Sequence, residues 1–449
     1  MIATFTLHAT GQKVSAELKE IERKYLIHFR RPDNYEGEFG FDWMRDNYKE
    51  ICNDYEALKK EYYDAEKKEK VEIEGQEYFV PWLSMFPNQK GVKLNLEVEK
   101  IDDYQVRDDD YIELPAKAGV SFNPDTFKVS EINQNTMVEV ICETPLISDT
   151  TIEVLSKNDK CIVGKLNVFK NATSYKLNVR FVEVKFKGSI QHNSDGIENK
   201  LDFSSNKSVA KASFLLEPNV VNLNMSRKIA EWKNYVELKE KEFDKKFQQS
   251  LIKYSPNRTN RGKIDYETLV INFGNFVVGT NKGGKGIDKI KKSITSIDID
   301  GIACKMENFI KGLKEMYESN VMSKKGVIVF LLPIIIRYSN PPKTEVFRPQ
   351  YFDGFADDIF SEGRYVMLAW KSPKFRDSTL IHEIAHTLGL VHSFQEKEID
   401  NGREVISKHI FEYGTTDNIM DYSVKSDVFW KWQWEKMQED INDLIPEKL

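Results

Sequence analysis

The spacing of hydrophobic and polar residues changes twice along the chain and predicts three domains. In residues 1–98, short strands are predicted at 2–8 and 25–29, where apolar and polar positions nearly alternate. A helix follows, because apolar and aromatic residues then recur at steps of three and four. Its predicted apolar stripe consists of Met44, Tyr48, Ile51, Tyr55, Leu58 and Tyr62. Residues 1–98 are therefore predicted to form a small α+β N-terminal accessory domain.

Residues 99–173 contain short alternating runs that are separated by Asn, Pro, Asp and Ser. These runs lie at 127–129, 137–141, 151–155 and 161–168. Short strands at such regular spacing are typical of a β-sandwich of the immunoglobulin type. The runs carry no catalytic motif, so this domain is predicted to act as a spacer or a docking surface.

Residues 174–449 mix strands with amphipathic helices. The pattern predicts strands at 178–186, 327–336 and 365–369, and helices at 226–254 and 303–317. Residues 427–444 hold three tryptophans within five positions. We interpret this last segment as a core helix, because its flanking charges are mixed in sign and do not favour a membrane surface.

The most informative segment is His382-Glu-Ile-Ala-His-Thr-Leu-Gly-Leu-Val-His392. Residues four apart share one helical face, so His382 and His386 can present imidazoles to a single ion. Glu383 lies about 100° further round the helix, where its carboxylate can reach a water on that ion. Gly389 can adopt the left-handed conformation that ends a helix and lets His392 return to the ion. Three neutral nitrogen ligands and one water are typical of a catalytic zinc site.

The alternative is a helix that carries surface histidines by chance. A bare HExxH is a weak signal, but a glycine and a third histidine at fixed offsets favour the metal site. The flanking residues agree with a buried helix. Asp377 and Ser378 are suitable N-caps, and Ile381, Ile384, Ala385 and Leu388 can be buried.

This motif resembles that of the metzincin clan of zinc peptidases, HExxHxxGxxH, at every fixed position. The resemblance covers residues 364–422 and implies a methionine turn under the metal, for which Met420 in Asn418-Ile-Met-Asp-Tyr422 is the candidate. It implies that Tyr422 is a fifth ligand or an oxyanion stabiliser. It also implies that the strand before the helix is an edge strand that pairs with the substrate. That strand comprises Tyr365, Val366, Met367, Leu368 and Ala369.

The fold class implied for residues 174–449 is an α+β metzincin-like zinc peptidase domain, in which a twisted mixed sheet carries the active-site helix. We expect a zinc-dependent endopeptidase that uses a zinc-activated water with Glu383 as general base. Two alternatives are an inert delivery or binding protein with a peptidase-like fold, and a cell-wall amide hydrolase. A fragment of residues 174–449 is expected to cleave small peptides, because it holds every proposed catalytic residue.

Two further motifs are weaker. The segment Gly279-Thr-Asn-Lys-Gly-Gly-Lys285 resembles a phosphate loop, but Gly286 stands where Ser or Thr would hold magnesium. We predict a surface loop there. The acidic stretch around 353–362 does not have the spacing of a calcium-binding loop and predicts a solvated rim of the cleft.

Composition limits the partners. A net charge of −6 without a basic stripe argues against nucleic acid. The N-terminus has no secretory pattern, and the longest apolar run, 327–336, is too short to span a bilayer, so stable membrane insertion is not expected. The expected partners are a protein or peptide substrate and a secretion-machinery or inhibitor protein that binds residues 1–173.

The layout also resembles bacterial peptidases that a contractile secretion machine delivers as toxins or effectors, which leaves localisation and export route open. The four cysteines are too few and too scattered for a disulfide framework. Cys142 and Cys161 lie in one β-rich region, and whether they pair stays open.

Overall fold

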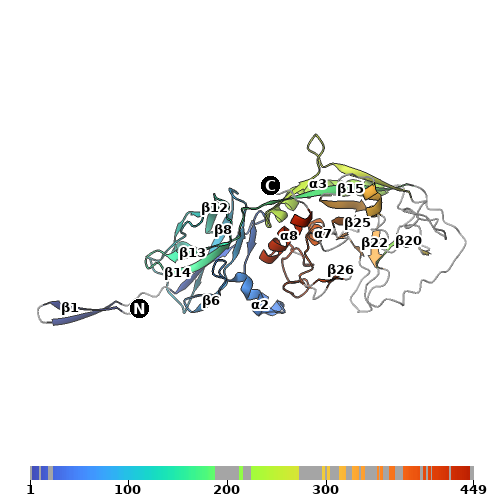
Figure 1. Cartoon of the computed structure of the whole chain (residues 1–449). Coiled ribbons are helices and arrows are strands. Elements are labelled where there is room, and N and C mark those ends of the chain that lie inside the picture. Colours follow the sequence, from blue (N-terminus) through green and yellow to red (C-terminus); the bar gives the residue numbers. More distant parts are fainter. Residues whose placement is uncertain are drawn as a thin grey trace. The chain divides into compact units, whose positions relative to one another are not determined.

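A computed structural model of the chain (Figure 1) consists of two compact units. It describes residues 24–187, 224–272, 313–319, 326–332, 364–369, 378–394, 407–423 and 426–444, together with short strands elsewhere. The first unit comprises Met1–Tyr35, Tyr62–Leu83 and Pro87–Lys170, and the second comprises Glu36–Glu61, Ser84–Phe86 and Asn171–Leu449. This division differs from the predicted domains 1–98, 99–173 and 174–449, because the N-terminal residues are shared between both units.

The first unit is built mainly from two sheets. One has the antiparallel order β10-β12-β8-β3, and the other includes β11-β9-β13-β14-β7. The strands of the first sheet are β3 (Tyr25–Arg30), β8 (Lys93–Lys100), β10 (Val120–Asn123) and β12 (Met137–Cys142). Those of the second are β7 (Trp82–Ser84), β9 (Tyr111–Glu113), β11 (Thr126–Lys128), β13 (Thr150–Ser156) and β14 (Ile162–Val168). The two sheets meet at β3 and β14, where a Cβ on Gly164 would lie 2.4 Å from the Ile27 carbonyl oxygen.

The four strands predicted between residues 127 and 168 are all present, as β11, β12, β13 and β14. The predicted boundary at residue 98 falls inside β8, which pairs with β3 of the preceding segment and with β12 of the following one. Cross-strand partners are chosen in three dimensions, so the local pattern did not show this. The immunoglobulin type stays a prediction. Two hairpins complete the described strands of this unit, β1 (Ala3–Ala9) with β2 (Gln12–Leu18) and β5 (Val71–Ile73) with β6 (Gln76–Tyr78).

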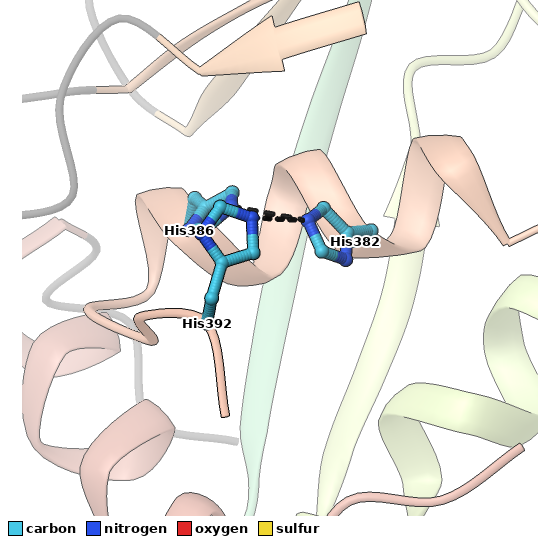
Figure 2. Close-up of side chains that lie close together, drawn as sticks. All are labelled: His382, His386 and His392. Atoms are coloured by element: carbon cyan, nitrogen blue, oxygen red, sulfur yellow. Dashed lines mark hydrogen bonds between the residues drawn. The ribbon is translucent and has the colours of Figure 1, made fainter. Parts of the chain in front are cut away.

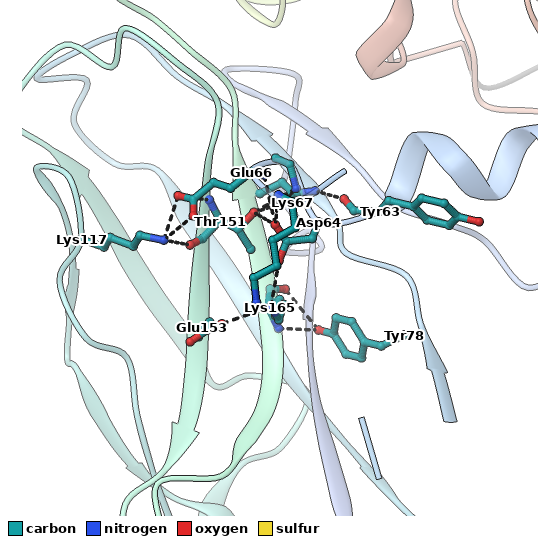
Figure 3. A network of polar contacts seen from close by, with 11 residues as sticks. Tyr63, Asp64, Glu66, Lys67, Tyr78, Lys117, Thr151, Glu153 and Lys165 are labelled. Atoms are coloured by element: carbon teal, nitrogen blue, oxygen red, sulfur yellow. Dashed lines mark hydrogen bonds and ion pairs between the residues drawn. The ribbon is translucent and has the colours of Figure 1, made fainter. Parts of the chain in front are cut away.

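A buried ion pair fixes the loop after residue 62 to this unit (Figure 3). The Lys165 Nζ lies 2.8 Å from Asp64 Oδ2 and 3.1 Å from Glu153 Oε1. Asp64 also accepts hydrogen bonds from the backbone N–H groups of Glu66 and Lys67. Burial by itself would raise the pKa of Asp64, but Lys165 and the backbone donors outweigh it and lower that pKa to about 2. The carboxylate therefore holds the loop as an anion.

The second unit contains a sheet of order β17-β15-β21-β25-β24, with β18 also paired to β15. Its strands are β15 (Tyr175–Lys187), β17 (Ile252–Pro256), β18 (Tyr266–Asn272), β21 (Val327–Leu332), β24 (Gly354–Ala356) and β25 (Tyr365–Ala369). All pairs are parallel except β24 with β25, which is antiparallel. Every residue of β21 is buried, as expected for a central parallel strand with both faces covered.

Three of the described helices that pack on this sheet are α3 (Asn224–Gln248), α7 (Thr379–Thr387) and α8 (Lys431–Leu444). α3 contacts β17 and β21, α7 contacts β24 and β25, and α8 contacts β15. The helix predicted at 226–254 is α3, although it ends earlier and the chain continues into β17. Its predicted inner residues are all buried: Ile229, Trp232, Val236, Phe243, Phe247 and Leu251. The three tryptophans of the C-terminal segment are also buried, as predicted for a core helix.

The strand predicted at 327–336 is wrong as one element. Its first part is β21, whereas β22 (Ile335–Tyr338) belongs to another sheet, with β16 (Ala212–Leu215) and β23 (Tyr351–Phe352). Pro333 stands between them and has no N–H for a sheet ladder. Of the helix predicted at 303–317, the structure describes Ala303, which ends a short strand, and residues 313–317, which are helical. Two short hairpins are β19 (Ser296–Asp298) with β20 (Gly301–Ala303), and β26 (Glu398–Asp400) with β27 (Arg403–Val405).

The single helix predicted near the N-terminus is broken. It consists of α1 (Tyr48–Ile51), α2 (Tyr55–Lys59) and the 3-10 turn η1 (Lys60–Tyr62), which follow the short strand β4 (Gly40–Asp42). Cys52 is extended between the helices and forms a β-bridge with Phe411. The Asn53 N–H donates to the Ile410 carbonyl at 2.9 Å. Backbone pairing with a distant loop of the second unit therefore replaces helical hydrogen bonds at this point.

Other sequence predictions concern thiols, membranes and loops. Cys142 is buried and Cys161 is exposed, and both are thiols, so these two residues are not joined. Among the helices of the described residues, none has the length and apolarity to cross a membrane. The loop at 279–286 and the acidic residues Asp353, Asp357, Asp358 and Glu362 lie outside the described residues.

Candidate metal centre

The first two motif histidines lie on α7, whose ends match the sequence prediction. Ser378 occupies the N-cap position, although its side chain makes no capping hydrogen bond. The helix ends before Gly389, which has a φ of +80° and donates its N–H to the His386 carbonyl at 3.0 Å. Asp377 lies outside the described residues. The residues predicted to be buried, Ile381, Ile384, Ala385 and Leu388, are all buried.

The three histidines converge on one point (Figure 2). The Nε2 atom of His382 lies 3.2 Å from the Nε2 atoms of both His386 and His392. Two nitrogens that bind one zinc tetrahedrally at 2.0–2.1 Å lie about 3.3 Å apart. Within the described part of the chain, this is the one group of three potential metal ligands that are this close together.

The hydrogen bonds on the other ring nitrogens determine which tautomers are present. The Nδ1 of His382 lies 2.8 Å from the Ile419 carbonyl oxygen, and the Nδ1 of His386 lies 2.7 Å from that of Leu390. A carbonyl oxygen only accepts, so each Nδ1 carries the proton and each Nε2 presents a lone pair. Two such lone pairs face each other at 3.2 Å. They repel unless a cation lies between them.

The electrostatics favour neutral ligands. Burial lowers the pKa of His386 well below its usual value, and the neighbouring His392 and His382 lower it further. A neutral imidazole is the form that binds a metal ion. The donor set therefore fits a metal ion, which His382, His386 and His392 lie close enough to hold.

Glu383 follows His382 on the same helix and is 8% exposed. Its side chain packs against the backbone of β24, because a Cβ on Gly354 would lie 3.0 Å from Glu383 Cγ. A glycine at the start of this strand therefore leaves the space that the glutamate side chain occupies.

The segment around Met420 lies directly against the histidines. Met420 is fully buried, and its carbonyl accepts a hydrogen bond of 3.1 Å from the N–H of Ser393, next to His392. The preceding carbonyl, that of Ile419, is the acceptor for His382. This turn therefore holds the His382 ring by a hydrogen bond to its Nδ1. It also holds the backbone beside His392 by a main-chain hydrogen bond. Tyr422 is 39% exposed, and its hydroxyl lies 2.8 Å from the His392 Nε2.

Two positioning side chains were missed at the sequence level. Asn418 Nδ2 donates to Gln433 Oε1 at 2.7 Å, and Gln433 Nε2 donates to Asn418 Oδ1 at 3.1 Å. Asn418 Oδ1 also accepts from the Met420 N–H at 2.9 Å. This reciprocal amide pair fixes the turn to α8. Gln433 is separated from the turn by residues of irregular structure, so no local pattern could identify it.

Asp421 was also missed, although it lies inside the quoted motif. Its carboxylate is buried and accepts hydrogen bonds from the N–H groups of Gly414, Thr416 and Tyr422 and from the Thr416 hydroxyl. A turn-rich stretch of Gly and Thr followed by Asp is a signal for such a loop. The carboxylate holds the loop before the turn and the backbone of Tyr422 in one arrangement.

The prediction that residues 365–369 form an edge strand is wrong. These residues form β25, which pairs with β21 in parallel and with β24 antiparallel. Both of its sides are occupied, so it has no row of backbone groups to offer a substrate. In the described part of this sheet, the strand at that edge is β24.

No protein-family model matches the sequence, and no curated protein matches it at a significant level. Function must therefore be inferred from the metal centre itself.

Proposed function

We propose that the chain is a zinc-dependent endopeptidase of the metzincin clan. The observation that carries the proposal is the convergence of the Nε2 atoms of His382, His386 and His392. The order of ligands, glutamate, glycine and methionine turn along the sequence supports the same clan. Zinc is one of the metals that imidazole nitrogens commonly bind.

The three histidines would hold the zinc ion. When bound, zinc supplies Lewis-acid chemistry, lowering the pKa of a water and polarising the scissile carbonyl. Glu383 accepts a proton from the attacking water and then passes it to the leaving amine nitrogen. Its position on α7, one residue after His382, places the carboxylate on the neighbouring face of the helix.

Tyr422 stabilises the oxyanion that forms as the carbonyl carbon becomes tetrahedral. Its phenol lies within hydrogen-bonding distance of the ligand atom of His392 and is partly exposed to solvent. It can therefore donate to a substrate oxygen near the metal. The alternative role of Tyr422 as a fifth ligand stays a prediction.

We further propose that an extended substrate pairs with β24 rather than with β25. β24 runs antiparallel to β25 and contacts the metal-binding helix α7. Main-chain pairing at such an edge supplies affinity without fixing the sequence of the peptide. A secretion-machinery or inhibitor protein that binds residues 1–173 stays a prediction.

The test replaces Glu383 with Gln. We expect the variant to bind one zinc per chain, because the histidines are unchanged, and to cleave a proteome-derived peptide library about 10²–10⁴-fold more slowly. Glu412→Gln is the matched control, since it removes an exposed carboxylate of the same unit and should retain activity. Elemental analysis and sequencing of the cleaved ends provide the two readouts.

Wild-type cleavage by Glu383→Gln would show that the assigned mechanism is wrong. A zinc-loaded wild-type chain that cleaves no peptide in the library would favour the inert scaffold. Activity on isolated cell walls alone would favour the amide hydrolase.

A further inference from the structure

Three aromatic side chains gather beside the metal centre. We call Phe394, Tyr413 and Tyr422 the aromatic trio. The ring centroids of Phe394 and Tyr413 lie 4.9 Å apart, those of Phe394 and Tyr422 5.2 Å, and those of Tyr413 and Tyr422 6.0 Å. The Phe394 ring also lies 5.1 Å from the ring of His392. The trio is thus continuous with a metal ligand.

The trio is not part of the hydrophobic core. Tyr413 is 59% exposed and Tyr422 is 39% exposed. They are the only aromatic residues among the exposed large hydrophobic side chains in the part of the chain that the structure describes. Aromatic rings that remain in water leave apolar area available for a ligand, and an exposed apolar patch of this kind marks a binding surface.

The backbone that carries two of these rings is held in place. Gly414, next to Tyr413, donates its N–H to Asp421 Oδ1 at 2.8 Å, and Tyr422 donates its N–H to the same oxygen at 2.7 Å. One buried carboxylate therefore fixes the backbone beside both tyrosines. A preorganised surface of this kind binds a ligand at a lower cost in conformational entropy.

We propose that the aromatic trio is the subsite for an aromatic or large aliphatic substrate side chain adjacent to the scissile bond. This inference rests on the proposed peptidase function. The position follows from the contact with His392, because a residue that reaches the trio has its backbone near the metal centre. The preferred side chain follows from ring chemistry, since aromatic pairs favour edge-to-face or offset contacts at 4.5–7 Å.

The test compares fluorogenic peptides that differ at one residue, Phe, Leu, Ala or Asp, on either side of the scissile bond. With the zinc-loaded full chain, we expect kcat/KM for the Phe and Leu peptides to exceed that for Ala by roughly 10-fold or more on one side of the bond. Tyr413→Ala should largely remove this preference. Tyr413→Phe should retain it, because the ring is kept. Leu238→Ala, which shortens a 72% exposed residue on α3, is the control and should retain the preference.

A second measurement does not require turnover. Calorimetry with the zinc-loaded chain compares N-acetyl-phenylalanine hydroxamate with N-acetyl-alanine hydroxamate, which share a metal-chelating group and differ in the side chain. We expect tighter binding of the phenylalanine compound to wild type and a smaller difference for Tyr413→Ala.

The outcomes separate the two proposals. Cleavage without a side-chain preference, or a preference that survives in Tyr413→Ala, overturns the subsite and leaves the peptidase function standing. A hydroxamate preference without cleavage of any peptide overturns the peptidase function and with it the subsite, because the trio would then bind a side chain with no scissile bond beside it. Absence of both overturns both.

Discussion

At the residue scale, Gly389 shows how closely the helix that carries His382 and His386 is packed. Its φ of +80° lies in the left-handed region that L side chains rarely adopt. A Cβ at this position would also lie 1.7 Å from the Asp440 Oδ2 on α8. The backbone conformation therefore favours glycine between His386 and His392, and an added Cβ would also displace the Asp440 side chain from its 2.8 Å hydrogen bond with Lys436.

Gly389→Ala is therefore expected to lower the free energy of unfolding by more than the roughly 1–2 kcal/mol of left-handed backbone strain. It should also weaken zinc binding, because the chain can no longer return His392 to the other ligands. Gly414→Ala is the matched control. Its φ is +73° and nothing lies within 4 Å of the added Cβ, so it should show the strain alone. Urea unfolding and a zinc competition assay measure both effects. Equal losses in the two variants would contradict the clash with Asp440.

At the scale of elements, the turn around Met420 depends on α8. The amide pair between Asn418 and Gln433 is buried, and Gln433 Oε1 also accepts the Trp430 N–H at 2.9 Å. A glutamine near the start of α8 therefore satisfies groups on the turn and on the residue that precedes the helix.

Gln433→Met should keep the volume but leave buried polar groups of Asn418 and Trp430 without these bonds. We expect a loss of about 1–3 kcal/mol in unfolding free energy and a lower affinity for zinc, because the Ile419 carbonyl that holds His382 would shift. Gln438→Met is the control. It removes a 2.9 Å bond to the Ser250 carbonyl elsewhere on α8 and should leave zinc affinity unchanged. If both variants bind zinc like wild type, the turn does not depend on this pair.

At the scale of the whole molecule, residues 36–61 belong to the unit that carries the metal centre. The buried Tyr48 accepts a 3.0 Å hydrogen bond from Trp430 Nε1, and Asp42 Oδ2 accepts one of 3.1 Å from the Lys431 N–H. The Glu412 N–H donates to the Ile51 carbonyl at 2.8 Å, in the loop that leads to Met420. An N-terminal segment thus forms part of the support for the C-terminal site.

A fragment of residues 171–449 is therefore expected to be poorly folded and to lose zinc binding, in contrast to the expectation from sequence for 174–449. The reason is that it lacks the buried partners of α8 and of the loop near residue 411. A chain that begins at residue 24 removes the β1–β2 hairpin and keeps this segment, so it should fold and bind zinc. Circular dichroism and zinc titration compare the two. A folded, zinc-binding fragment 171–449 would show that the segment is dispensable.

Two carboxylates, the buried Asp64 in one unit and the partly buried Glu61 in the other, link stability to pH. The pKa of Asp64 is lowered from 3.8 to about 2 and that of Glu61 from 4.5 to about 2. In both residues burial by itself would raise the pKa, but hydrogen bonds to the carboxylate outweigh this effect. Lys165 donates to Asp64, and His409 and Lys408 donate to Glu61. A folded pKa below the unfolded value stabilises the protein at higher pH, and this stability is lost as the pH falls from about 4.5 towards 2.

We expect each carboxylate to account for about 2–3 kcal/mol of this loss. Urea unfolding at several pH values between 5 and 2 measures it for the wild type. Asp64→Asn should be less stable at pH 5 and should show a shallower decline in the first unit. An unchanged slope in that variant would mean that Asp64 does not remain ionised in the folded protein.

The sequence by itself predicted the group of three histidines, because their spacing along one helix and across one glycine brings three imidazoles together, close enough to hold a metal ion. It also predicted elements in which apolar residues recur at regular intervals, namely α3 and the strands β11 to β14. Only the tertiary structure decided the pairing of β25 on both sides and the break at Cys52. It alone placed residues 36–61 and Gln433 against the site. Each of these depends on partners that are distant in sequence, and a local pattern of polar and apolar positions does not specify which distant backbone or amide will satisfy a hydrogen bond.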